Sequence, residues 1–249
     1  MADYNTIRTA QGHATRSAAI DEGLRAYMSK VYGLMAVGMA VTAAFAWGIS
    51  SMAVGPDGQV TQLGYAIYDS PLKWVIMFAP LLVVFAFGAM INRMSTATAT
   101  LVFYGFAALM GLSISSIFLV YTSVSIVQTF LITAIAFAGL SLYGYTTKRD
   151  LSGMRTFLMM GLIGLIVAMI VNIFLQSSAM QFAISAIGVL LFAALTAYDT
   201  QNIKNTYLAL ANSNQDFLGK SAIMGALTLY LDFLNLFMFL MQFMGQSRD

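Results

Sequence analysis

The last third of the chain contains the stretches Leu195-Thr196-Ala197-Tyr198-Asp199-Thr200-Gln201-Asn202-Ile203-Lys204 and Leu229-Tyr230-Leu231-Asp232-Phe233-Leu234-Asn235-Leu236-Phe237. Each stretch places an aspartate in or against a segment that is apolar enough to cross a membrane. An ionised carboxylate in hydrocarbon costs at least about 2.5–3.5 kcal/mol, so it needs a partner, water or a proton. We therefore predict that Asp232 is a functional residue and that Asp199 is its partner.

The composition identifies a membrane protein with several spans. Hydrophobic residues make up 59% of the chain and charged residues only 9%, whereas a soluble domain carries about 25% charged residues. The 12 Lys and Arg barely exceed the 10 acids, which leaves no basic surface for nucleic acid. There is no Cys, and the single His13 lies in the polar N-terminal segment. We therefore expect no disulfide, no His-based catalytic triad and no resident cofactor.

Seven apolar stretches predict an all-α integral membrane protein, because each is close to the roughly 20 residues that a helix needs to cross a bilayer. They lie at about 31–50, 73–91, 97–120, 126–146, 156–176, 180–200 and 222–244. Residues 1–30 form a polar tail, in which an apolar pattern from Ile20 predicts an interfacial helix leading into the first span. Residues 31–249 form the seven-helix transmembrane domain, and a polar loop is expected over 201–221.

The positive charges predict the orientation of the chain in the membrane. Ten of the 12 Lys and Arg fall in the N-terminal tail and in the connections after the second, fourth and sixth spans. Only Lys73 and Arg248 fall on the other side. Because Lys and Arg are retained on the cytoplasmic side, we expect a cytoplasmic N-terminus and an external C-terminus.

The two aspartates are expected to meet, since they lie on consecutive spans and differ in depth by about one helical turn. Two carboxylates in one site do not both ionise cheaply and titrate as a unit, so a shared proton would make a pH switch. Fully ionised, Asp199 and Asp232 would attract Ca²⁺, which prefers hard oxygen ligands. Asn202 and Asn235 each follow an aspartate by three residues and would add hydrogen bonds or ligands. Alternatively, Asp199 is an interfacial residue and Asp232 is hydrogen-bonded alone inside the bundle.

Arg93 has two interpretations. It ends the second span on the same predicted side of the membrane as Asp199, so a guanidinium–carboxylate pair would act as a latch on the cytoplasmic mouth. It is also an ordinary positive anchor of the kind that fixes topology.

At these residues the chain resembles the bacterial branch of the Bax inhibitor-1 family of seven-helix membrane proteins. The resemblance rests on the two aspartate stretches, with support from Lys148-Arg149-Asp150-Leu151-Ser152 and Asn172-Ile173-Phe174, and it covers the chain after the tail. It implies a central seventh helix surrounded by the other six, a pH-sensing pair at Asp199 and Asp232, a latch at Arg93 and a calcium leak. Some bacterial members carry a glutamate in the second span, where residues 73–91 here have no acid. An ion path that relies on that glutamate does not carry over.

Three functions compete. The favoured one is a pH-sensitive cation leak, with calcium as the permeant ion, in the bacterial inner membrane. The second, suggested by other members of the family, is an interaction protein that regulates a membrane protease or a stress or cell-death response without ion flux. The third, an intramembrane aspartyl protease, also uses two aspartates on its sixth and seventh helices. That class requires Gly-x-Gly-Asp on the seventh helix, where this chain has Leu229-Tyr230-Leu231-Asp232, so we do not expect an enzyme.

Overall fold

The computed structural model describes residues 3–55, 58–211 and 214–248, with side chains from Ile20 onward. Over these residues the fold is helical, apart from short connections and two isolated antiparallel bridges. Seven of the helical segments are long and apolar enough to cross a membrane. The predicted all-α integral membrane protein is therefore confirmed.

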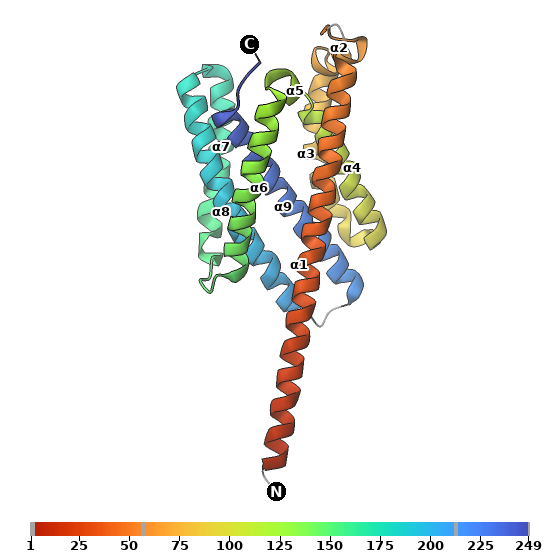
Figure 1. Cartoon of the computed structure of the whole chain (residues 1–249), viewed down its shortest axis with the longest axis vertical. Helices are drawn as coiled ribbons and strands as arrows, with labels where there is room; N and C mark the ends of the chain where they lie inside the picture. The colour runs from red at the N-terminus through yellow and green to blue at the C-terminus, as the bar shows by residue number, and fades with distance from the viewer. Residues whose placement is uncertain (1–2, 56–57, 212–213, 249) are drawn as a thin grey trace.

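A polar side chain caps the start of several long helices, which satisfies backbone N–H groups of their first turns. Ser95, Thr122 and Ser177 accept hydrogen bonds from backbone N–H groups of the first turns of α4, α6 and α8. Figure 1 shows the resulting bundle. The helical elements are α1 (Asp3–Ala53), α2 (Gln62–Tyr68), α3 (Leu72–Met90), η1 (Ile91–Arg93), α4 (Thr96–Ile114), α5 (Ile117–Val120), α6 (Ser123–Thr146), η2 (Ser152–Met154), α7 (Arg155–Leu175), α8 (Ser178–Leu210) and α9 (Gln215–Met244).

The seventh span, α9, is the centre of the bundle. In its most apolar stretch 67% of the residues are buried, whereas no other span exceeds 39%. α1, α4, α6 and α8 pack directly against α9, while α3 packs mainly on α4 and α7 on α8 (Figure 1). The central position of the seventh helix is therefore confirmed, with α3 and α7 in an outer layer.

Polar contacts in the core fix the helices that surround α9. Tyr230 of α9 is fully buried, and its hydroxyl lies 2.7 Å from the hydroxyl of Thr42 on α1. Thr42 in turn donates to the backbone carbonyl of Ala107 on α4, at 2.9 Å. Because an unpaired buried hydroxyl is costly, this chain of hydrogen bonds sets the register of three helices at once.

The N-terminal segment differs from the prediction. α1 is one continuous helix of 51 residues, so the predicted interfacial helix and first span form a single element. Leu24, Tyr27 and Met28 are buried in the main core, and the hydroxyl of Tyr27 lies 2.9 Å from that of Ser221 on α9. The apolar face that suggested a helix on the membrane surface is therefore covered by protein.

The polar loop predicted over 201–221 is wrong in extent, since α8 continues to Leu210 and α9 begins at Gln215. Ile203 and Tyr207, one helical turn apart, are buried, whereas Asn202 and Asn205 are exposed. The polar residues thus form the outer face of an amphipathic helix.

Candidate functional site

The carboxyl groups of Asp199 on α8 and Asp232 on α9 meet inside the bundle. They lie within hydrogen-bonding distance of each other, and a hydrogen bond between two carboxyls requires a proton on one of them. Asp232 is only 5% exposed, while Asp199 is partly buried. The structure therefore brings together the two residues that the sequence singled out, and their role as a sensor stays a prediction.

No cation neutralises this pair among the residues that the structure describes. The ion pair found there joins Lys220 to Asp216 instead, at 2.9 Å. One oxygen of Asp232, Oδ2, is buried and accepts no hydrogen bond from an N–H or hydroxyl donor in the described part of the chain. Leaving a buried acceptor unpaired costs about 1–3 kcal/mol. Such a group calls for an explanation, and a functional role is one of the usual ones.

Helix α6 packs against α8 and α9 beside the site. The hydroxyl of Thr200, next to Asp199, donates to that of Ser141 at 3.3 Å. The ring of Phe233, next to Asp232, meets Phe137 edge-on at 5.4 Å between centroids. Gly144 lets α6 approach this closely, because a Cβ at that position would overlap the backbone carbonyl of Ala197 on α8.

The remaining predicted site residues do not bond to the pair. Arg93 is exposed at the end of η1 and makes no ion pair with Asp199 among the described residues. Asn202 is exposed, and the amide of Asn235 donates to the carbonyl of Leu231 on its own helix at 2.8 Å. The structure does not bring Arg93 and Asp199 into contact, so the latch stays a prediction.

Sequence reasoning missed a polar tie between α4 and α9. Asp216, in the first turn of α9, accepts a hydrogen bond from the Thr96 hydroxyl at 2.6 Å and pairs with Lys220 one turn later. A carboxylate in the first turn of a helix complements the helix dipole. The Asp-to-Lys spacing of four residues is the sequence signal that points to this helix start.

Two residues just after Asp199 anchor the connection between α6 and α7. Gln201 accepts from the backbone N–H of Leu151 and donates to the carbonyl of Arg149, both at 2.8 Å. Lys204 donates to the carbonyl of Tyr145 at 2.7 Å. The sequence resemblance included both residues, but gave no sign of these bonds, because their partners lie about fifty residues away in the chain.

Asp150 lies in the same connection and is exposed. The backbone N–H of Ser152 donates to its carboxylate at 2.9 Å. This hydrogen bond favours the ionised form and holds the pKa of Asp150 below its usual value.

The site offers few ligands for a resident metal ion. In the described part of the chain, no group of three or more His, Cys, Asp or Glu side chains comes together. Ca²⁺ takes about six to eight oxygen ligands in a stable protein site. Two carboxylates supply only part of such a shell.

Comparison of the sequence with known proteins finds one matching family and several similar bacterial proteins. The model of the family described as "Inhibitor of apoptosis-promoting Bax1" matches residues 24–249. An uncharacterized protein of Rickettsia prowazekii is 43% identical over 250 residues, and one of Caulobacter vibrioides is 44% identical over 251 residues, each covering 100% of both chains. The inner membrane protein YbhL of Escherichia coli is 44% identical over 226 residues, which cover 91% of this chain and 94% of YbhL.

Proposed function

This chain belongs to the Bax inhibitor-1 family, and from that premise we propose that it is a proton-sensitive cation leak of a bacterial inner membrane. Asp199 and Asp232 would form its gate. The observation that carries the proposal is the contact between two carboxyls inside the bundle, without a neutralising cation among the described residues. The name of the Escherichia coli relative supports the location.

The proposed mechanism follows from the chemistry of the pair. With one proton present, the two carboxyls share a hydrogen bond that joins α8 to α9. Without that proton, two like charges face each other at hydrogen-bonding distance and repel. The protonation state would therefore set the spacing of these helices, and ions would pass along α9 in only one of the two states.

The test is ion flux through purified protein in liposomes, measured across pH. An Asn side chain resembles a neutral carboxyl in shape but does not titrate, so Asp199→Asn and Asp232→Asn should each flatten the pH profile. Their flux at every pH should match that of the wild type at its acidic end. Asp150→Asn, which changes an exposed loop carboxylate, is the control and should keep the wild-type profile. If both variants keep the wild-type dependence of flux on pH, the pair is not the sensor.

Calcium is the permeant ion of this proposal, since ionised carboxylates attract divalent cations. Parallel measurements with Ca²⁺, Na⁺ and K⁺ define the selectivity. If the purified protein passes no ion at any pH, the leak is wrong. The pair would then tune the shape of an interaction protein, for which a membrane protease is the first partner to test.

A further inference from the structure

A cleft of about 450 Å³ lies between α1 and α6. Both helices belong to membrane-spanning segments, Ile20–Ala53 and Ser123–Thr146. Leu142, on the rim of the cleft, is 63% exposed. The cleft therefore opens sideways toward the membrane, and its volume lies in the range of small-molecule sites, about 300–1,000 Å³.

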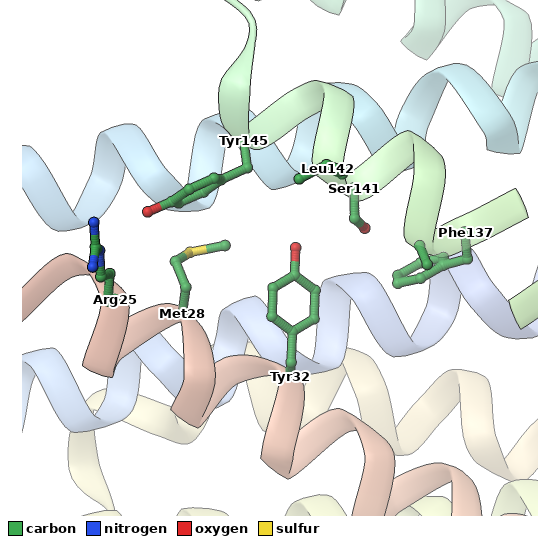
Figure 2. Close-up of a pocket in the computed structure, with 8 residues that line it drawn as sticks. Arg25, Met28, Tyr32, Phe137, Ser141, Leu142 and Tyr145 are labelled. Atoms are coloured by element: carbon green, nitrogen blue, oxygen red, sulfur yellow. The ribbon is translucent and has the colours of Figure 1, made fainter. Parts of the chain in front are cut away.

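The lining is apolar along most of its length and carries one charged side chain. Met28 and Tyr32 of α1 face Phe137, Ser141 and Tyr145 of α6, as Figure 2 shows.

Arg25 lies at one end of the cleft and Phe137 at the other, and the Tyr145 hydroxyl points toward the Arg25 end (Figure 2). Among the described residues Arg25 forms no ion pair. A second cation is close to this end, because the Lys204 ammonium lies 5.2 Å from the centre of the Tyr145 ring.

We propose that this cleft is a binding site for one glycerophospholipid, whose phosphate pairs with Arg25 and whose acyl chain lies between Met28, Tyr32 and Phe137. A guanidinium binds phosphate through two parallel hydrogen bonds, and a basic group at the end of an apolar groove between spanning helices suits a lipid headgroup. Asp21 and Glu22 are exposed one turn before Arg25. They would face the outer part of the headgroup, so a zwitterionic lipid also fits.

Two residues of the cleft also pack against the helices that carry the carboxyl pair. Phe137 and Ser141 line the cleft and also contact the neighbours of Asp232 and Asp199. A bound acyl chain would therefore contact residues that pack against α8 and α9. The lipid site does not depend on the leak, since its argument uses only the shape and charge of the cleft.

The experiment uses the whole protein in liposomes with a phosphatidylglycerol that carries a photoreactive group on its acyl chain. Adducts are expected on α1 near Met28 and Tyr32 and on α6 near Leu142. Unlabelled phosphatidylglycerol or phosphatidylethanolamine should compete, and diacylglycerol, which lacks the phosphate, should not. Arg25→Gln should weaken competition about fivefold, the effect expected for one basic residue near the membrane surface. Arg155→Gln, an exposed arginine outside the cleft, should have no effect.

A second pair of variants tests the cleft itself. Ala138→Trp fills it from an exposed rim position and should abolish the adducts. Ile135→Trp, three residues away on the lipid-facing side of α6, should leave them intact. Adducts that persist in Ala138→Trp, or diacylglycerol that competes as well as the phospholipids, would overturn the proposal. So would rapid oxidation of Met28 by hydroxyl radicals in liposomes, because that result would show a cleft filled with water.

Discussion

A single residue, Thr42, shows how buried polar atoms in this bundle are paired across helices. Its hydroxyl links the buried Tyr230 of α9 to the Ala107 carbonyl of α4. Thr42→Val keeps the volume but leaves the Tyr230 hydroxyl unpaired, so we expect a loss of about 1–3 kcal/mol in the free energy of unfolding. Thermal unfolding in detergent measures this. Thr100→Val is the control, since in the described part of the chain Thr100 bonds to a carbonyl of its own helix and to no other helix. An equal loss in both variants would contradict the bridging role.

The contact between the two carboxyls could be predicted because the cost of burial can be read from the sequence, while their role as a sensor stays a prediction. Asp199 and Asp232 were identifiable because a carboxylate within an apolar segment requires a partner. Asn202 was assigned by its spacing from Asp199, and Arg93 by its predicted side of the membrane and the family resemblance, and both are exposed. Spacing along a helix does not reveal how that helix is rotated against its neighbours, so it could not decide which polar residues face the pair.

At the scale of helices, the approach of α6 to α8 depends on Gly144. A methyl group there would overlap the carbonyl of Ala197, and backbone atoms can move only if the helices separate. We expect Gly144→Ala to cost about 1–3 kcal/mol, the usual effect of overpacking, and to alter the pH profile of the carboxyl pair. Gly139→Ala is the matched control on the same helix, where a Cβ meets nothing within 4 Å. Equal stability and pH profiles for the two variants would show that this close approach is unimportant.

The number of helices was predictable from apolar length, but two of their ends were not. Residues 201–210 lack the composition of a span, yet they continue α8 because Ile203 and Tyr207 bury one face. The same holds for Leu24 and Tyr27 in α1. These segments are stabilised by contacts with distant helices, and a window of local hydropathy does not contain that information.

At the scale of the whole molecule, the orientation in the membrane is testable with single cysteines in this Cys-free chain. α2 and the α6–α7 connection lie at opposite ends of the bundle (Figure 1). The distribution of Lys and Arg predicts that Asp69→Cys, next to α2, reacts with an impermeant thiol reagent added outside intact cells. Asp150→Cys should react only after the membrane is opened. The reverse pattern would show that the predicted orientation is inverted.

The central position of α9 has a consequence for how the protein is made. Chains leave the ribosome N-terminal end first, so six spans enter the membrane before the helix against which four of them pack. Until α9 is inserted, Asp199 lacks its partner Asp232, and the helices α1, α4, α6 and α8 lack the helix against which they pack. Nascent chains that stop after Leu210 should therefore be rapid substrates of membrane quality-control proteases, with a much shorter half-life in pulse-chase experiments than complete chains. Equal half-lives would mean that the first six helices form a stable bundle by themselves.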